Sequence, residues 1–206
     1  MNKTIAIIDY GMGNLKSVAR AFERVGASIV VTDEAAKIRS ADKIVLPGVG
    51  SFGHCMKNLK DKGLDQLVKD EIRQGKIFFG ICLGLQVLFD SSAESADVKG
   101  LGLIRGTVQR FTTTALKVPH MGWNQVDYKS DRRIFASIGQ GENFYFVHSY
   151  YVCPQDESVI AATADYGERF CAAVQVGNIY ACQFHPEKSQ QSGLQVIKNF
   201  CDLGPT

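Results

Sequence analysis

Cys82 lies in a segment whose glycine spacing could present a nucleophile. Residues Gly80–Gly84 read Gly-Ile-Cys-Leu-Gly and separate two short apolar runs. Glycines two positions before and two after a nucleophile permit the tight strand-to-helix turn known as a nucleophile elbow. The positive end of a helix dipole would favour the Cys82 thiolate, and the N–H of Leu83 would face an oxyanion formed on an attacked carbonyl. Taken alone, the pattern equally fits a small buried thiol between packing glycines.

A histidine and a glutamate two positions apart supply the groups that such a thiol needs. His185 and Glu187 belong to a Gln-Phe-His-Pro-Glu segment after a predicted strand, and the residue before a proline favours extended backbone. Positions two apart share a face of an extended chain, so Glu187 should hold one imidazole nitrogen while the other accepts a proton from Cys82. The alternative is an exposed His–Glu ion pair, which the elbow disfavours. Because His120 and His148 have no acid two residues away, we interpret both as structural.

A glycine-rich segment, Gly48–Gly53, contains a literal GxGxxG pattern. A dinucleotide-binding fingerprint should run smoothly from strand to helix and find an acidic residue after a second strand. Here Pro47 interrupts the turn, and Asp70 and Glu71 fall in a helical pattern. We therefore expect this segment to lie beside the elbow, where its backbone can supply a second oxyanion N–H.

Together these segments resemble the class I (triad) glutamine amidotransferases, which hydrolyse glutamine through a cysteine thioester. The resemblance runs from Ile5 to the final predicted helix. Two motifs, PHMGWN and HSYY, make the resemblance more specific than the superfamily, because they are similar to those of the glutaminase subunits of imidazole glycerol phosphate synthase. The segments that carry the resemblance are Leu46–Gly50, Gly80–Gly84, Pro119–Asn124, Phe146–Tyr151 and Gln183–Ser189.

The resemblance implies a role for each matched residue. Cys82 would attack the side-chain amide, His185 would pass the proton to the departing ammonia, and Glu187 would orient the imidazole. Val49 and Leu83 would provide the oxyanion N–H groups. No cofactor and no metal are implied.

Six further positions match residues that recognise glutamine in the family. Glu94 would bind the free ammonium group, although a solvated acid at a helix end is the alternative. Gln86 lies one helical turn beyond Cys82, and its alternative is ordinary helix packing. The full set is Gly48, Gly50, Gln86, Glu94, Ser149 and Tyr150.

The family also implies a partner. Ammonia becomes non-nucleophilic ammonium in water, and the family docks this subunit on a beta-alpha barrel cyclase as a heterodimer that receives the ammonia. The cyclase forms imidazole glycerol phosphate and aminoimidazole carboxamide ribotide in histidine biosynthesis. Asn14, Trp123 and Lys188 match interface positions, although a lone tryptophan is equally expected in a core.

Two other functions fit parts of the pattern. The glutaminase could serve another pathway, as in anthranilate or pyridoxal phosphate synthase, but the PHMGWN motif argues against this. A non-catalytic regulatory domain with the same fold is the second alternative. It should have lost a member of the triad, and this chain retains all three.

The elements that would position these residues change in kind along the chain. Up to about Gly100, predicted strands alternate with predicted helices. The strands are Ile5–Asp9, Ser28–Thr32, Lys43–Leu46 and Ile77–Phe79. Later strand-like runs lack long helices between them, and Gly177–Asn178 predicts a hairpin turn before a closing helix. We therefore predict one α/β domain over residues 1–206. Its mostly parallel central sheet is flanked by helices and carries antiparallel additions in the C-terminal half.

Composition excludes several other classes of protein. The 206 residues carry a formal charge of +2, too balanced for a nucleic-acid surface over the whole molecule. No apolar run approaches the roughly 20 residues of a membrane helix, and the N-terminal run is too short for a signal peptide. The six cysteines and four histidines show no zinc-binding spacing. We expect a cytoplasmic protein with reduced thiols, bound neither to nucleic acid nor to membranes.

Overall fold

The N-terminal half alternates strands and helices, as the sequence predicts. The computed structural model describes residues 3–129 and 131–204. The elements of this half are β1 (Thr4–Ile8), α1 (Leu15–Arg24), β2 (Ser28–Thr32), α2 (Ala35–Ser40), β3 (Lys43–Gly48), α3 (Phe52–Asp61), α4 (Leu64–Arg73), β4 (Ile77–Cys82) and α5 (Leu83–Gln86).

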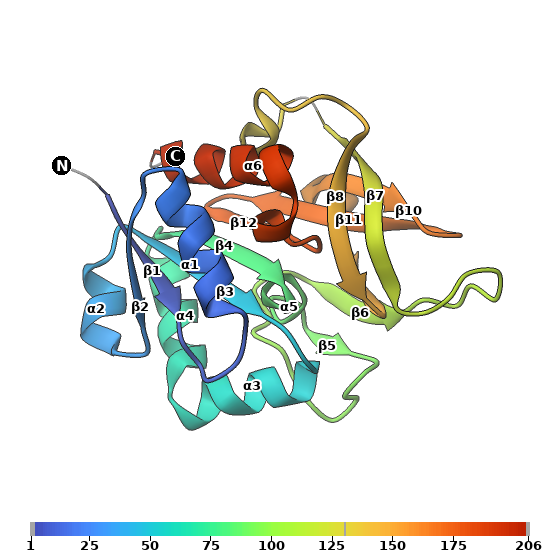
Figure 1. Ribbon diagram of the computed structural model, residues 1–206. Helices are drawn as coiled ribbons and strands as arrows, with labels where there is room; N and C mark the ends of the chain where they lie inside the picture. Colours follow the sequence, from blue (N-terminus) through green and yellow to red (C-terminus); the bar gives the residue numbers. More distant parts are fainter. Residues whose placement is uncertain (1–2, 130, 205–206) are drawn as a thin grey trace.

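Buried residues on both faces of these strands explain why helices cover the sheet on two sides. Side chains alternate along a strand, so Ile5 and Ile7 face one way and Ala6 and Ile8 the other. Ile5 and Ile7 join one core cluster with residues of α1 and the last helix, α6 (Gln190–Asp202). Ala6 and Ile8 join a second cluster with residues of α2, α3 and α4. Figure 1 shows these two groups of helices on opposite sides of the sheet.

The C-terminal half adds mainly antiparallel strands and short 3₁₀ helices (η). Its elements before α6 are β5 (Ser91–Ser92), β6 (Gly106–Arg110), β7 (His120–Tyr128), η1 (Arg133–Phe135), β8 (Glu142–His148), β9 (Tyr150–Pro154), η2 (Glu157–Val159), β10 (Ile160–Asp165), β11 (Arg169–Val176), β12 (Ile179–Cys182) and η3 (Pro186–Lys188).

The order of strands brings distant parts of the chain together at one edge. The main path of the sheet runs β2-β1-β3-β4-β12-β11-β10-β7-β8, with β12 parallel to β4 and the later neighbours antiparallel. Gly48 of β3 pairs with Cys82 of β4, and Cys182 of β12 pairs with Ile81. The carboxyl ends of β3, β4 and β12 therefore lie side by side, where open α/β sheets place their ligands.

The predicted fold class is confirmed, and several elements differ in detail. Val176 pairs with Ile179 across Gly177–Asn178, so the predicted hairpin is present. Helix α3 is not among the predicted elements, and the glycine-rich segment Gly48–Gly53 overlaps only its first two residues. Strands β7 and β9 were likewise treated as motifs and not as strands.

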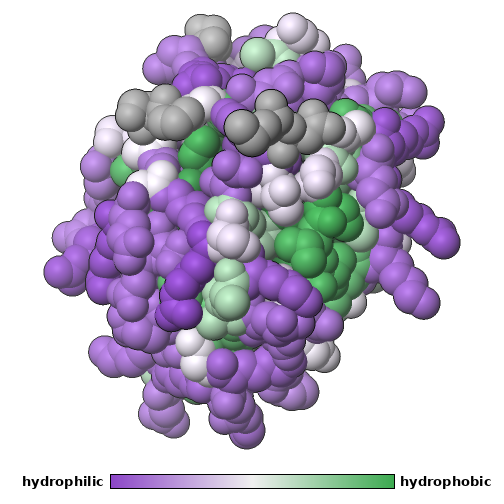
Figure 2. Space-filling model, turned by 90° about the vertical axis from the view of Figure 1, so that its left-hand side faces the viewer, coloured by the Kyte–Doolittle hydropathy of each residue, from purple (hydrophilic) through white to green (hydrophobic). Residues whose placement is uncertain are grey.

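One face of the molecule is mainly hydrophilic. Figure 2 shows the face on the left of Figure 1, where hydrophilic residues predominate and the hydrophobic colour is confined to a limited area. Within residues 3–129 and 131–204, no helix combines the length and apolar character needed to cross a bilayer. In the same residues, no cluster of three or more His, Cys, Asp or Glu could hold a metal ion.

Candidate active site

Cys82 occupies a strained turn at the end of β4. Its backbone φ of 55° and ψ of −105° lie outside the usual regions for a residue with a side chain, a strain of about 1–3 kcal/mol. The flanking glycines make the turn possible. A Cβ on Gly84 would lie 1.9 Å from the Leu46 carbonyl oxygen, and one on Gly80 would lie 2.5 Å from the Gly84 oxygen. The elbow is therefore present.

The helix after Cys82 is short. Helix α5 ends at Gln86 after a single turn, so it has little macrodipole to favour a thiolate. Stabilisation of the sulfur must then come from individual groups around it.

His185 and Glu187 form a buried ion pair. The Nδ1 atom of His185 lies 2.8 Å from Oε1 of Glu187, and their side chains are 3% and 1% exposed. The predicted contact is observed, but the expected extended geometry is wrong. His185 is extended, whereas Pro186–Lys188 forms the 3₁₀ turn η3, which brings the carboxylate back to the ring. The Oγ of Ser189 donates to the His185 carbonyl at 2.7 Å and holds this turn.

The charge of His185 is set by its two neighbours. Burial by itself lowers the pKa of His185, but Cys82 and Glu187 outweigh it and raise this pKa to about 10. The imidazole is therefore protonated at neutral pH. Its Nε2 has no hydrogen-bond partner among the described residues, so it is free to donate to a reacting group.

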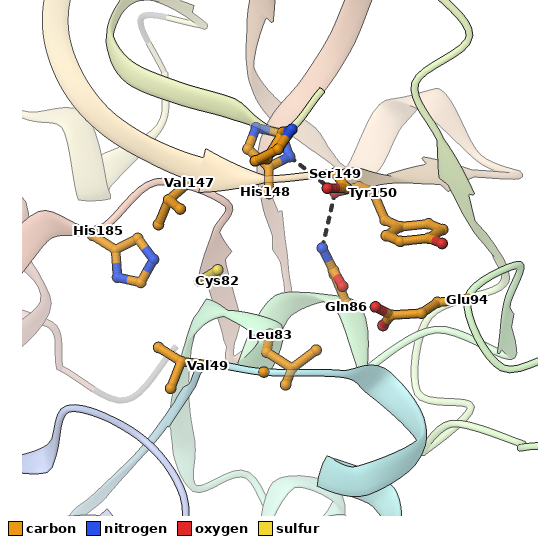
Figure 3. Close-up of a pocket in the computed structure, with 12 residues that line it drawn as sticks. Val49, Cys82, Leu83, Gln86, Glu94, Val147, His148, Ser149, Tyr150 and His185 are labelled. Carbon is orange, nitrogen blue, oxygen red and sulfur yellow. Dashed lines mark hydrogen bonds between the residues drawn. The ribbon is translucent and has the colours of Figure 1, made fainter. Parts of the chain in front are cut away.

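A cavity of about 260 Å³ joins the elbow to most of the predicted substrate residues. This size is slightly below the roughly 300–1,000 Å³ of drug-sized ligand sites and suits a small metabolite. Figure 3 shows the Cys82 sulfur between His185 on one side and Gln86 on the other, with Glu94 beyond Gln86. The lining residues are Val49, Gly50, Cys82, Leu83, Gln86, Glu94, Pro119, Val147, His148, Ser149, Tyr150 and His185.

The predicted substrate and oxyanion residues fall at different depths around this cavity. Val49 and Gly50 border it, whereas Gly48 is buried in β3 and lies beside Leu83. Glu94 lines the far end, where one carboxylate oxygen accepts the Phe52 N–H at 2.7 Å. Glu187 does not line the cavity, which agrees with a role behind His185.

The three predicted interface residues lie at the surface. Asn14 is exposed directly before α1, and Trp123 is 48% exposed on β7. The Lys188 ammonium lies 5.5 Å from the centre of the Tyr145 ring, and Trp123 packs edge-on against the same ring at 6.0 Å. Trp123 is therefore not a core residue.

The sequence analysis assigns no role to one polar residue at this site, Gln183, and interprets another, His148, as structural. Nε2 of Gln183 lies 3.6 Å from the Cys82 sulfur, and the sequence signal was its position two residues before His185. His148, interpreted as structural, borders the cavity and is hydrogen bonded to His120 at 2.9 Å.

Burial acts on the thiols of the other five cysteines. Burial raises the pKa of each of the remaining thiols, to about 12 for Cys55 and Cys171 and to about 11 for Cys201. Cys153 and Cys182 shift in the same direction for the same reason. Thiols of this kind react slowly at neutral pH.

Comparison with known proteins assigns the fold and the family. Residues 6–203 match the family model described as glutamine amidotransferase class-I. The imidazole glycerol phosphate synthase subunit HisH of Syntrophotalea carbinolica is 54% identical over 205 residues, covering 97% of this chain and 100% of that protein. The subunit of the same name from Geobacter sulfurreducens is 52% identical, covering 97% and 98%.

Solved structures resemble the chain at the level of fold. A structure titled as a glutamine amidotransferase has a TM-score of 0.74 at 17% identity, covering 96% of this chain and 99% of that one. A chain of PurLQS from Thermotoga maritima also has a TM-score of 0.74, at 20% identity, covering 97% and 98%.

Proposed function

The chain belongs to the glutamine amidotransferase class-I family. From its similarity to the HisH subunits, we propose that it is the glutaminase subunit of an imidazole glycerol phosphate synthase in histidine biosynthesis. The reaction is hydrolysis of glutamine to glutamate and ammonia. We treat residues 1–206 as one amidotransferase domain acting in the cytoplasm. The observation that carries the proposal is that the Cys82 elbow and His185, which is paired with the buried Glu187, meet at one cavity of about 260 Å³.

Attack begins from a thiolate and an imidazolium. The Cys82 thiolate adds to the side-chain carbonyl carbon of glutamine, and the carbonyl oxygen becomes an oxyanion. The backbone N–H groups of Leu83 and Val49 are the donors for this charge, each worth about 10²- to 10³-fold in rate when aligned. Protonated His185 gives its Nε2 proton to the amide nitrogen as the C–N bond breaks and ammonia leaves.

Hydrolysis of the thioester returns the site to its starting state. Neutral His185 accepts a proton from water as the water oxygen attacks the thioester carbonyl. The C–S bond then breaks, glutamate leaves, and the electron pair stays on sulfur beside the restored imidazolium. Glu187 keeps Nδ1 protonated throughout, so Nε2 is the nitrogen that exchanges protons.

In the proposed binding mode, glutamine lies along the cavity. The amide end is placed at Cys82 and the ammonium group at Glu94, which lie apart on the two sides of Gln86 in Figure 3. Ser149 and Tyr150 are the proposed ligands of the substrate carboxylate, and their position in the lining of the same cavity supports this role. Gln86 shapes the wall between the two ends.

A beta-alpha barrel cyclase is the proposed partner and the destination of the ammonia. The surface formed by Trp123, Tyr145 and Lys188 offers an aromatic anchor and a positive charge, and Asn14 adds a second contact point. Docking there would shield ammonia from protonation by bulk water.

The test is glutamate release by the chain mixed with the cyclase and its nucleotide ligand, beside Cys82→Ala. We expect activity that requires the cyclase and falls to background in Cys82→Ala. Activity without need of the cyclase would keep the glutaminase and overturn the pathway. Absence of activity in a folded protein would favour a regulatory domain.

A further inference from the structure

Gln183 is a buried polar residue that the triad does not account for. It follows β12 directly, two residues before His185, and its side chain is fully buried. The Nε2 atom lies 3.6 Å from Sγ of Cys82, within the range of an N–H···S hydrogen bond. A buried amide has to pair both its oxygen and its nitrogen, so the orientation of this group carries information.

Neighbouring groups determine which end of the Gln183 amide faces the sulfur. Nε2 of Gln86 lies 2.9 Å from the carbonyl oxygen of Tyr150, which can only accept. The same Gln86 nitrogen lies 3.1 Å from Oε1 of Gln183 and donates to it. Gln183 therefore turns its oxygen toward Gln86, and its N–H₂ group toward Cys82.

The Tyr150 carbonyl that anchors this arrangement is itself held by a pair of histidines. Nδ1 of His148 lies 2.9 Å from the Tyr150 oxygen, and the two dashed lines of Figure 3 meet at that oxygen. His120 Nδ1 lies 2.9 Å from His148 Nε2. Burial lowers the pKa of His120 to about 4 and that of His148 to about 3, so both rings are neutral at pH 7.

Only one proton arrangement satisfies this pair. The Tyr150 carbonyl oxygen can only accept a hydrogen bond, so His148 carries its proton on Nδ1 and accepts at Nε2. His120 must then carry its proton on Nδ1 and accept at Nε2, which lies 3.3 Å from the amide nitrogen of Asn124. That amide is oriented independently, because Asn124 Nδ2 donates to the Asp165 carbonyl at 2.7 Å. The Tyr150 carbonyl thus accepts from His148 on one side and from Gln86 on the other, and Gln86 in turn donates to the oxygen of Gln183.

We propose that Gln183 is a further catalytic residue, whose side-chain N–H donates to the Cys82 thiolate. The one-turn helix α5 offers little dipole, and Gln183 supplies a donor that the elbow lacks. No bond to Gln183 forms or breaks. The N–H holds the sulfur before attack and stabilises it again when the electron pair returns to sulfur on thioester hydrolysis. Its effect on turnover rests on the glutaminase function proposed above, whereas its effect on the thiol does not.

The primary test measures the thiol of the isolated chain. Gln183→Leu removes the donor, and Gln183→Glu keeps an acceptor for Gln86 while placing an oxygen near the sulfur. Iodoacetamide alkylation of the Cys82 peptide is followed by mass spectrometry from pH 5 to 10. We expect the pH of half-maximal rate to rise by about one unit in Gln183→Leu and further in Gln183→Glu. Gln66→Leu, on the surface of α4 and bonded only to Asp70, should leave the profile unchanged.

A second measurement avoids substitution of Gln183 and so does not depend on folding of its variants. In the wild-type chain, the side-chain amide resonances of Gln183 should shift over the pH range in which Cys82 becomes reactive. In Cys82→Ala they should stay constant over that range.

Glutamine turnover then separates a catalytic from a packing role. We expect kcat to fall about tenfold to a hundredfold in Gln183→Leu, with KM changed less than threefold. Unmoved alkylation profiles, or amide resonances that do not respond to Cys82, would overturn the proposal even if kcat fell. Should the wild type fail to hydrolyse glutamine, the proposed function would fail, while the alkylation and resonance results would still decide the role of Gln183.

Discussion

Two buried histidine sites near the cavity differ in charge, one being protonated and the other neutral at pH 7. His185 lies beside the Glu187 carboxylate and the Cys82 sulfur, and its pKa is raised to about 10. His120 and His148 contact each other, and His148 contacts the Tyr150 carbonyl. Burial lowers the pKa of His120 to about 4 and that of His148 to about 3. Burial is common to both sites, so the anionic partners make the difference. One site carries a mobile proton, and the other holds its protons in fixed positions.

Removing the Glu187 carboxylate should lower the pKa of His185 toward those of His120 and His148. In Glu187→Gln the His185 ring loses its anionic partner, and the variant should lose about 10³- to 10⁴-fold in kcat with little change in KM. The His185 ring resonances should also titrate well below pH 10 in the variant. The measurement is glutaminase kinetics with histidine NMR. An unchanged ring titration would show that Glu187 does not set the charge of His185.

Removing one imidazole of the His120–His148 pair should lower the free energy of unfolding. His148→Leu leaves the His120 N–H without an acceptor and takes one donor from the Tyr150 carbonyl. We expect a loss of about 2–4 kcal/mol in the free energy of unfolding, measured by urea denaturation. His54→Leu, on the exposed side of α3, should change it by less than about 0.5 kcal/mol. A loss as small as that of the control would remove the structural role of the pair.

The two sites should also oppose each other in the pH dependence of stability. In the unfolded chain, His120 and His148 become protonated near pH 6.5. In the folded chain, His120 becomes protonated only near pH 4 and His148 only near pH 3. Stability should therefore fall as the pH drops from 6.5 toward 4, by up to about 1.4 kcal/mol per pH unit for each ring. His185 acts in the opposite sense, because its stabilising contribution is complete below pH 6.5 and is lost as the pH rises through 10.

A double variant isolates the contribution of the pair from that of the carboxylates. His120→Gln/His148→Gln should show a shallower slope of unfolding free energy between pH 4 and 6.5 than the wild type. Urea denaturation at several pH values measures it. Parallel slopes in the two proteins would contradict the neutral state of both rings.

The parallel half of the fold could be predicted because its signals are local. Strands buried on both faces read as apolar runs, such as Ile77–Phe79, and the turn at Gly177–Asn178 is a short-range pattern. Helix α3 also carried a signal that was overlooked. Its buried residues recur at helical spacing, which is typical of a helix packed on one face. They are Phe52, Cys55, Met56 and Leu59.

Local reasoning was less reliable for backbone geometry at the site. The contact between His185 and Glu187 was expected, yet an extended chain was the wrong reason for it. Pro186 starts a 3₁₀ turn, as proline often does at the beginning of a helix, and this turn depends on Ser189 and on strand β8 for its position. The apolar run after Cys82 likewise does not show where α5 ends, and the structure ends it at Gln86.

The sequence by itself determined which reactive groups this protein has and on which strand ends they lie. Glycine spacing, apolar runs and the order of the motifs are properties of short stretches of chain. Only the tertiary structure decided how these groups are oriented and charged. The hydrogen bonds that orient Gln183 join side chains 97 and 101 residues apart, and they exist because β12 inserts beside β4. Burial and partners across the sheet, which no spacing encodes, then set the proton on each histidine.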